Sequence, residues 1–412
     1  MQLIGLDLGT QGIKFVVAEI AKTGEIKILK VIESPSHGLR RGVIFDLDQV
    51  VAATTDIFVS LKKQYKQASR NIFVGVNGPQ VNSQISRGIV AVSRADNEIY
   101  KDDIERVLKA SQTIMLSSNR KIIHRLTREY IVDGVKEIYD PTGLVGNRLE
   151  VETILVDVFH QYLQNLSRLI ELHGCGLGGY VLNPIAASRA VLTKNQRELG
   201  VLLLDIGAQT TGLTIYQENK LDFTTVLPLG SNYITNDVAV GFKISSGDAE
   251  SLKMGYGYAI SKHITQKDSI ELKLVNATLK NTIPRRFLSE IIESRMSEVF
   301  SLVNDVLKRT HMVGKLPGGV VLVGGGAKLP GLVDLARDEL RMTSVLGMPT
   351  GEIAYSDIEF PNSELEDPSL AVPLGLVLEG FDLLTKDKIF RPGNWGNPII
   401  NFFKSFLKSL LP

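Results

Sequence analysis

The chain has 412 residues, of which 44% are hydrophobic and 22% charged, as in ordinary globular proteins, and this length predicts two to four domains. A net charge of +1, from 46 basic and 45 acidic residues, argues against nucleic acid as a partner. The single cysteine, Cys175, excludes an internal disulfide and a cysteine-based zinc site. Because the N-terminus does not have a signal-peptide pattern and no window of 18 uncharged apolar residues occurs, we expect a cytoplasmic protein without a membrane span.

The first half of the chain alternates strand and helix patterns, which favours α/β layers. Residues 3–9 and 13–20 predict a hairpin, residues 46–68 a helix and residues 71–78 a buried strand. Residues 83–150 differ, because short strand-like runs surround one helical stretch at 100–115, and this predicts a small inserted α+β module. Residues 154–174 have apolar positions at helical spacing from 155 to 170, so we expect one helix there, closed by Gly174.

The second half contains another strand–turn–strand unit at 202–216, a long amphipathic helix at 284–310 with Pro284 at its head, and a third strand-to-turn unit at 318–332. A formal match to the dinucleotide fingerprint occurs in "GCGLGG" at 174–179. We do not expect a Rossmann site there, because that use needs a strand before the glycines and a helix after them, and the flanking patterns are reversed.

The two hairpin units share one layout, in which an apolar run ends on an aspartate and a small turn follows. The first is "LIGLDLGTQGIKFVV" at 3–17 and the second is "LLLDIGAQTTGLTIY" at 202–216. Small turn residues let backbone N–H groups approach phosphate oxygens, and a carboxylate beside the turn can hold Mg²⁺ through water. Asp-Gly turns are also common in ordinary hairpins, but two such turns with the glycine triple at 324–326 predict a nucleotide cleft.

These motifs resemble those of the actin-like ATPase superfamily. "GLDLGTQGIK" is similar to its first phosphate motif, "LLDIGAQTTGLTIY" to its second and "VLVGGGAKLPGL" to its adenosine motif, while "PLGLVLEG" at 373–380 is similar to its second connecting helix. Within the superfamily the chain resembles the FtsA family of bacterial division proteins. The segments that carry this resemblance are "SPSHGLRRGVIFDLDQV", "HRLTREYIVDG", "DPTGLVGNRLEV", "DAESLKMGYGYA" and "IPRRFLSEIIESRMSEVF".

The resemblance implies an α/β, two-lobed actin-like fold with an inserted small α+β subdomain and a C-terminal amphipathic helix. Subdomain IA would comprise 1–82, 161–196 and 372–385, and the inserted subdomain IC would comprise 83–160. Subdomain IIA would comprise 197–229 and 315–371, and subdomain IIB 230–314, followed by a linker at 386–398 and the helix at 399–412.

The resemblance also implies the residues that bind ATP and Mg²⁺. The first phosphate motif supplies Asp7, Gly9, Thr10, Gln11 and Lys14, and the second supplies Asp205, Gly207, Ala208, Thr210 and Thr211. Glu250 and Lys253 would line the base and ribose, unless they lie on a solvated helix face, and Gly325, Gly326 and Ala327 would pack against adenosine. Asp7 and Asp205 would hold Mg²⁺ through water.

The second phosphate motif departs from the superfamily pattern. Ala208 and Gln209 replace glycines, and Gly212 stands where a second aspartate is usual. Asn183 is the nearest candidate for guiding a water, but an amide is no base. We therefore expect ATP binding with slow or negligible hydrolysis. A sugar-kinase-like enzyme would need a catalytic aspartate and a sugar pocket, for which no signal is present. A PilM-like adaptor of type IV pilus assembly remains an alternative, since "DIGAQTT" is similar to that family too.

The resemblance further implies partners. The C-terminal peptide of the division polymer FtsZ is expected on the helix at 284–300, through Arg285, Arg286 and Arg295, although these side chains could instead pair with Glu290, Glu293 and Glu298. Self-assembly into filaments at the septal Z ring, and contacts with other division proteins, are also implied.

The last residues predict a membrane anchor. The large apolar residues lie on one helical face, the opposite face carries only positive charge, and a Gly/Pro/Asn-rich linker precedes them. The predicted membrane-binding residues are Ile399, Ile400, Phe402, Phe403, Lys404, Phe406, Leu407, Lys408, Leu410 and Leu411. We expect peripheral attachment to an anionic membrane at the inner face of the cell membrane, although a helix docked on the body or on another chain would show the same stripe. PilM-like proteins lack such a tail, which favours the FtsA resemblance.

Overall fold

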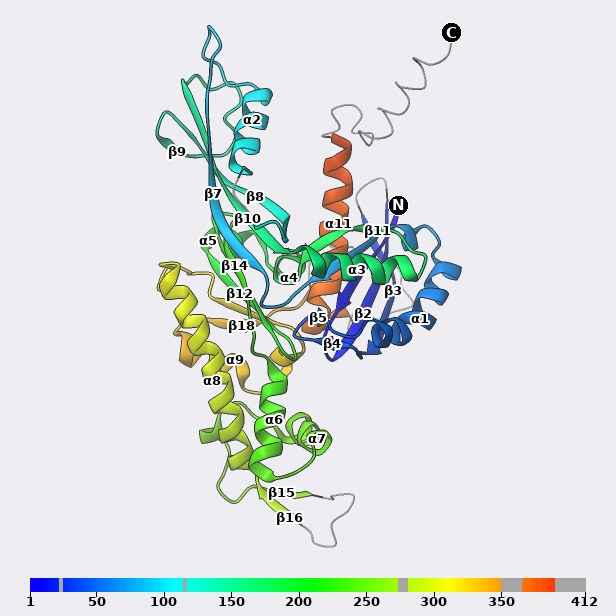
Figure 1. Cartoon of the computed structure of the whole chain (residues 1–412). Helices are drawn as coiled ribbons and strands as arrows, with labels where there is room; N and C mark the ends of the chain where they lie inside the picture. Colours follow the sequence, from blue (N-terminus) through cyan, green and yellow to red (C-terminus); the bar gives the residue numbers. More distant parts are fainter. Residues whose placement is uncertain (22–24, 114–116, 273–280, 350–364, 390–412) are drawn as a thin grey trace.

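The computed structural model describes residues 1–21, 25–113, 117–272, 281–349 and 365–389. These residues form two lobes and a protruding module (Figure 1). Each lobe is built on a five-stranded sheet, with the strand orders β11-β6-β1-β2-β3 and β14-β13-β12-β17-β18. Both sheets have the same plan. Three consecutive antiparallel strands form a meander, and two further parallel strands are added beside the first strand of that meander. The two similar hairpins of the sequence are therefore equivalent parts of two similar sheets.

The first lobe contains β1 (Gln2–Leu8), β2 (Gly12–Ile20), β3 (Ile26–Pro35), β6 (Ile72–Val76) and β11 (Leu177–Leu182). Helices α1 (Leu47–Gln64) and α3 (His160–Leu172) cover one face of this sheet. Helices α4 (Asn183–Val191) and α11 (Ala371–Ile389) cover the other. Asp46 caps α1 by accepting a hydrogen bond from the backbone N–H of Gln49 at 3.1 Å.

The second lobe contains β12 (Val201–Ile206), β13 (Thr211–Gln217), β14 (Lys220–Leu227), β17 (Val320–Val323) and β18 (Ser344–Leu346). Helices α8 (Arg285–Arg309) and α9 (Leu332–Leu340) pack on one face, whereas α4 and α11 lie between the two sheets. The far end of this lobe is formed by α6 (Ser231–Phe242), α7 (Ser246–Tyr256) and the hairpin of β15 (Ser269–Leu272) and β16 (Asn281–Pro284). Helix α5 (Lys194–Leu199) joins the lobes.

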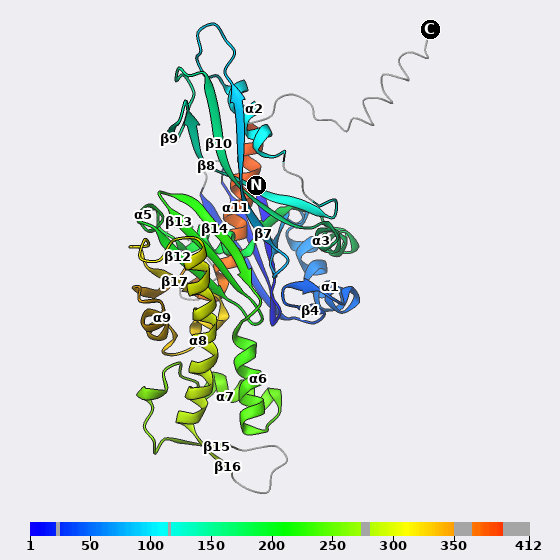
Figure 2. The same ribbon diagram turned by 60° about the vertical axis from the view of Figure 1, so that its left-hand side comes forward.

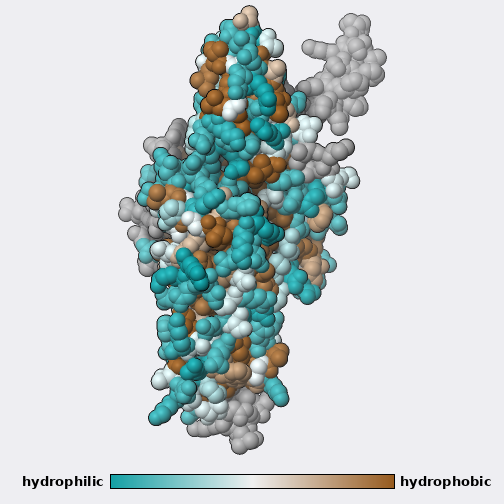
Figure 3. Space-filling model, turned by 90° about the vertical axis from the view of Figure 1, so that its left-hand side faces the viewer, coloured by the Kyte–Doolittle hydropathy of each residue, from teal (hydrophilic) through white to brown (hydrophobic). Residues whose placement is uncertain are grey.

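The protruding module confirms the predicted α+β insertion. Its sheet has the order β7-β10-β8-β9, from β7 (Asn82–Ala91), β8 (Arg120–Val132), β9 (Val135–Ile138) and β10 (Arg148–Phe159), and α2 (Lys101–Ser111) packs on one face. Gly88 allows this close packing, because a β-carbon there would collide with the carbonyl oxygen of Val107. Figure 2 shows the module projecting beyond both lobes. Figure 3 shows hydrophobic patches on the surface of the module. Val135 and Val145 are among its exposed apolar side chains.

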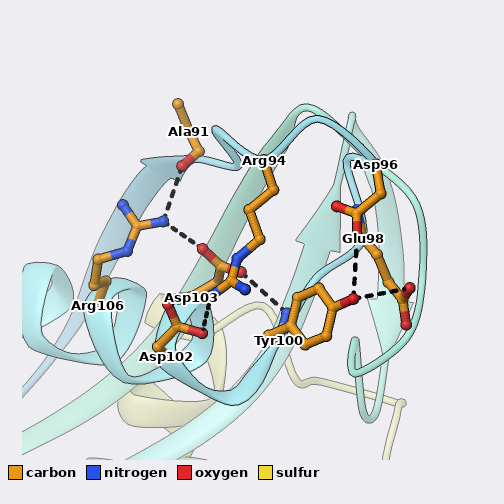
Figure 4. Close-up of polar contacts among 8 residues, drawn as sticks. All are labelled: Ala91, Arg94, Asp96, Glu98, Tyr100, Asp102, Asp103 and Arg106. Atoms are coloured by element: carbon orange, nitrogen blue, oxygen red, sulfur yellow. Dashed lines mark hydrogen bonds and ion pairs between the residues drawn. The ribbon is translucent and has the colours of Figure 1, made fainter.

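Polar contacts hold the outer loop of the module to the start of α2 (Figure 4). The hydroxyl of Tyr100 donates to Asp96 at 3.1 Å and to Glu98 at 3.2 Å, and Arg94 donates to Asp102 at 2.6 Å. Figure 4 also shows the ion pair of Arg106 with Asp103. The acidic side chains of this loop therefore all have partners within the module, and the loop is tied to the helix.

The prediction of one helix over 154–174 is wrong for its first part. Residues up to Phe159 belong to β10, which is the inner strand between β7 and β8, and α3 begins at His160. Strand β10 is apolar on both faces near its end, where Ile154, Leu155 and Val156 are all buried. A short run that is buried on both sides has no strand period, so its spacing cannot be distinguished from that of a buried helix. The end of the helix is as predicted, with Gly174 at φ +64°.

Residues 368–385 are long and apolar enough to cross a membrane, but 61% of this stretch is buried within the protein. Gly5 and Gly375 allow α11 to pack closely, because β-carbons there would collide with the carbonyl oxygens of Pro373 and Ala186. We therefore assign this stretch as a core helix. Helix α11 continues to Ile389, four residues into the expected linker. The predicted amphipathic helix at 399–412 lies outside the described residues.

Candidate nucleotide site

The first hairpin of each lobe has an aspartate just before its turn, and these two turns, called the Asp turns, lie between the lobes. Asp7 precedes the β1–β2 turn and pairs in register with Lys14, and Asp205 precedes the β12–β13 turn and pairs in register with Gly212. The third glycine turn follows β17 and packs on the second. Gly324 has φ +88°, and a β-carbon there would lie 2.5 Å from Oδ1 of Asp205. At Gly325 no atom of the described residues lies within 4 Å of the position of a β-carbon, so among these residues its backbone borders open space.

The two aspartates share one electrostatic environment. Burial raises the pKa of Asp205 to about 7, the negative charge of Asp7 acts in the same direction, and Lys14 opposes both. Burial also raises the pKa of Asp7, although Lys14 and a hydrogen bond from Asn183 oppose the shift. Asp205 is buried and Asp7 is half-buried, and two carboxylates that repel each other in this way fit a divalent cation, because the cation would favour the ionised form of both. The donor set therefore suits the Mg²⁺ that was predicted at Asp7 and Asp205.

Lys14 has partners of its own in the first lobe. Its Nζ donates to the carbonyl oxygen of Ser369 at 3.1 Å and lies 3.6 Å from a carboxylate oxygen of Glu33. Ser369 belongs to the short turn before α11, so Lys14 connects the first phosphate turn to the connecting helix. Its side chain is 13% exposed and carries the positive charge that acts on both aspartates.

Asn183 is the first residue of α4, and its orientation decides what it can do. Its Nδ2 donates to Oδ1 of Asp7 at 3.0 Å. Its Oδ1 is buried and has no hydrogen-bond partner among the described residues. That oxygen faces Gly75, where a β-carbon would collide with it. The amide therefore donates to Asp7, and its only acceptor atom points away from the carboxylate.

Glu250 and Lys253 form a network on α7 rather than a solvated face. Nζ of Lys253 lies 2.7 Å from Glu250 and donates to the hydroxyl of Thr235 at 2.9 Å, and Lys253 is only 5% exposed. Burial would raise the pKa of Glu250, but hydrogen bonds from Lys253, Thr235 and Gln11 together lower it. Gln11 belongs to the first phosphate turn, so this contact crosses from one lobe to the other.

The structure thus brings the two phosphate turns, the third glycine turn and the Glu250–Lys253 pair close together where the lobes meet. It also shows residues there that the sequence analysis missed. Asn77 donates to the hydroxyl of Thr210 at 3.0 Å, and the backbone N–H of Arg41 donates to Oε1 of Gln209 at 2.8 Å. The only sequence signal for Arg41 is its place before Gly42 in a short apolar-flanked turn, and Asn77 simply follows a buried strand.

A second hollow lies on the second lobe, away from the Asp turns. This groove between α6 and α8 has a volume of about 470 Å³ and is lined by Asp237, Val240, Gly241, Phe287, Glu290, Ile291, Ser294, Arg295 and Glu298. Val240 and Phe287 are exposed apolar side chains on its walls. Of the three predicted partner-binding arginines, Arg295 lines the groove, Arg286 precedes it on the same helix, and Arg285 lies at the β15–β16 end.

All three arginines are paired within the chain. Arg285 contacts Asp268 at 3.0 Å, Arg286 contacts Glu290 at 3.3 Å, and Arg295 contacts Asp237 at 2.6 Å and also pairs with Glu298. Pairing with Glu290 and Glu298 is the alternative that the sequence left open, whereas Glu293 instead accepts a hydrogen bond from Ser261 N–H at 2.7 Å. Surface pairs of this kind are weak, so a partner carboxylate can compete for them.

Solved structures with the same fold include actin-like proteins. The PilM–PilN type IV pilus biogenesis complex matches with a TM-score of 0.66 and 18% identity, covering 92% of this chain and 98% of that one. MreB5 of Spiroplasma citri bound to ADP matches with a TM-score of 0.55 and 14% identity, covering 94% and 98%. At these identities the likeness shows the fold alone, so the expected actin-like architecture is confirmed, and the pilus-adaptor alternative gains nothing beyond the fold.

Sequence relatives decide between the families. The family model for cell division protein FtsA matches residues 202–375, and that for the SHS2 domain inserted in FtsA matches residues 78–157. Cell division protein FtsA of Bacillus subtilis is 35% identical over 82% of this chain and 76% of its own length. FtsA of Pseudomonas aeruginosa is 30% identical over 92% and 89%. The chain therefore belongs to the FtsA family of cell division proteins.

Proposed function

We propose that this division protein binds Mg-ATP between its lobes, hydrolyses it slowly, and tethers FtsZ filaments to the inner face of the cell membrane while assembling into filaments itself. The observation that carries the nucleotide part is the pair of interacting carboxylates at the two glycine turns, the buried Asp205 and the half-buried Asp7. The ADP in the MreB5 structure of the same fold supports this assignment. When bound, Mg²⁺ would neutralise phosphate charge, and the two aspartates would hold it.

Different residues at this site would bind different parts of the nucleotide. Backbone amides of the turns at Gly9–Thr10 and Ala208–Thr210 would bind phosphate oxygens, and Lys14 supplies a nearby positive charge. The open backbone at Gly325 leaves room for the adenosine. The half-buried Glu250 and the buried Lys253 lie beside the first phosphate turn and offer a carboxylate and an ammonium group for the ribose and base.

Slow hydrolysis follows from the residues around Asp7. Water attack on a phosphate needs a group that orients the water or accepts its proton. The side-chain amide of Asn183 donates to Asp7, and its side-chain oxygen faces Gly75. Gly212, where a second aspartate is usual in the superfamily, has no side chain that could act on a water. This arrangement supports binding without fast turnover.

FtsZ attachment is proposed at the α6–α8 groove. Its exposed apolar walls, Val240 and Phe287, suit the large side chains of a short peptide, and Arg286 and Arg295 can exchange their own carboxylate partners for those of the peptide. An acidic peptide with apolar residues therefore matches the chemistry of this surface.

Membrane attachment is proposed for residues 399–411. Their apolar stripe and two lysines suit an anionic bilayer surface, where each nearby cation adds about 1 kcal/mol. One such tail binds reversibly, whereas several tails on one filament bind firmly. Filament formation and tethering are thereby linked.

Vesicle flotation with purified FtsZ tests the tether. The full chain should carry FtsZ to the top of a gradient with anionic vesicles, and a chain ending at residue 398 should leave both proteins at the bottom. If the shortened chain floats FtsZ as well as the full chain does, the tail is not the anchor.

Calorimetry tests the nucleotide site separately. Asp7→Ala should weaken Mg-ATP binding about tenfold or more, which corresponds to about 1.4 kcal/mol, because it removes a metal-binding carboxylate. Asp48→Ala, in the first turn of α1 outside the site, serves as the control. Equal affinity of wild type and Asp7→Ala would refute the assignment of the site.

A further inference from the structure

The hairpin of β4 (Leu39–Arg40) and β5 (Val43–Ile44) has an unusual turn. Arg41 and Gly42 have φ values of +49° and +73°, so both central residues are left-handed, as in a type I′ turn. The first position of such a turn favours Asn, Asp or Gly, because other side chains are strained there. An arginine held in this conformation calls for a compensating role.

Arg41 makes its contacts with the opposite lobe. Its backbone N–H donates to Oε1 of Gln209 at 2.8 Å. Its guanidinium donates to the hydroxyl oxygen of Tyr233 on α6, from Nε at 3.1 Å and from Nη2 at 2.8 Å. The hairpin lies where the first lobe meets the second (Figure 1). One residue of the first lobe thus binds the second phosphate turn and the helix that follows it.

Both ends of this contact are held in place. On the first lobe, the carbonyl oxygen of Gly42 accepts a hydrogen bond from the buried hydroxyl of Tyr162 at 2.9 Å. On the second lobe, the ring of Tyr233 lies under the guanidinium of Arg295, 5.9 Å from its centre. The Asn77–Thr210 hydrogen bond crosses between the lobes beside the same turn. Because each partner is fixed to its own lobe, these hydrogen bonds break when the lobes separate.

Gln209 is also one of the two residues that replace glycines in the second phosphate turn. A glycine at this position has no side-chain acceptor and could not reach the N–H of Arg41. The altered turn therefore carries an inter-lobe contact that the usual turn would not provide. This gives the substitution a physical role beyond the loss of a glycine.

We propose that Arg41, Gln209 and Tyr233 form a clamp that holds the two lobes together beside the phosphate turns and slows the release of bound nucleotide. The proposal rests on the proposed function as far as nucleotide release is concerned. The contact between the lobes itself stands on the hydrogen bonds alone. Gln209 and Tyr233 act as positioning residues, because the clamp acts through the distance between the lobes.

Two measurements on the full chain test the clamp. The first is the dissociation rate of a fluorescent ATP analogue, mant-ATP, chased with excess ATP. Gln209→Gly and Tyr233→Phe should each speed dissociation about threefold to tenfold, as expected for the loss of one or two hydrogen bonds. Together they should have less than their combined separate effects, because they interrupt one contact. Arg40→Ala, the neighbouring exposed arginine, should leave the rate unchanged.

The second measurement is hydrogen exchange of the peptide around Arg41 in protein without nucleotide. Gln209→Gly should raise exchange at this turn, because it removes the acceptor of the Arg41 N–H, and Arg40→Ala should not. Unchanged exchange in Gln209→Gly would overturn the clamp. A faster release in Gln209→Gly without any change in Tyr233→Phe would also overturn it, because the effect would then arise within the phosphate turn. Failure of the wild type to bind mant-ATP would refute the proposed function, whereas the exchange result would still decide the lobe contact.

Discussion

Acid should destabilise this protein through a buried histidine next to the nucleotide site. His124 on β8 is 8% exposed, and its Nε2 accepts a hydrogen bond from the backbone N–H of Leu182 at 2.9 Å. Leu182 directly precedes Asn183, which donates to Asp7, so this hydrogen bond helps to place the start of α4. Burial lowers the pKa of His124 to about 4 from 6.5. The ring therefore stays neutral in the folded protein, with its proton on Nδ1.

The sign of the pH effect follows from this lowered pKa. Between about pH 6.5 and 4 the unfolded chain binds a proton at His124 that the folded chain does not, so stability falls as the pH falls. A shift of this size costs about 3.4 kcal/mol over the full titration, and about 1.2 kcal/mol between pH 7 and 5.5. Above pH 7 the contribution of His124 is constant.

Urea unfolding followed by circular dichroism at several pH values measures this loss. His124→Gln keeps an acceptor for the Leu182 N–H but cannot titrate, so its stability should fall by about 1.2 kcal/mol less than that of the wild type between pH 7 and 5.5. His37→Gln, at an exposed position, should follow the wild type. If His124→Gln loses stability as steeply as the wild type, the reasoning is refuted.

Three further predictions address the proposed function. Phosphate release should stay below about 1 s⁻¹, the low end of ordinary enzyme turnover, because Asn183 supplies no base. A faster rate in a single-turnover assay would contradict this prediction. The double variant Arg286→Glu, Arg295→Gln should weaken binding of an FtsZ C-terminal peptide, measured by fluorescence anisotropy, while the control Arg309→Glu at the end of the same helix should not. Normal peptide binding by the double variant would place the site elsewhere. The Phe403→Glu variant should keep the wild-type melting temperature but fail to sediment with anionic vesicles, because lipid cannot solvate the charge. A large drop in melting temperature would instead indicate a docked core helix.

The sequence alone predicted the parts of the fold that depend on local patterns. Each Asp turn follows a buried strand and contains small residues, so the strand, the turn and the carboxylate are all visible within about ten residues. The 25 residues of α8 keep one apolar stripe, and a long stripe is a reliable helix signal. The inserted module was visible because its short strand-like runs differ from the regions around it. The order of these motifs was enough to indicate the actin-like architecture and the FtsA resemblance.

Tertiary structure determined the features that depend on contacts between distant segments, which local sequence patterns cannot predict. Residues 154–159 form an inner strand because two neighbouring strands bind them, and burial on both faces erases the two-residue period. Asn183 could be named as a site residue, but only the packing of α4 on Gly75 shows that its acceptor faces away from Asp7. Arg41 and Gln209 are 168 positions apart, and no pattern in either segment predicts their hydrogen bond. Local sequence sets which atoms a segment offers, whereas the approach of distant segments determines which of those atoms meet.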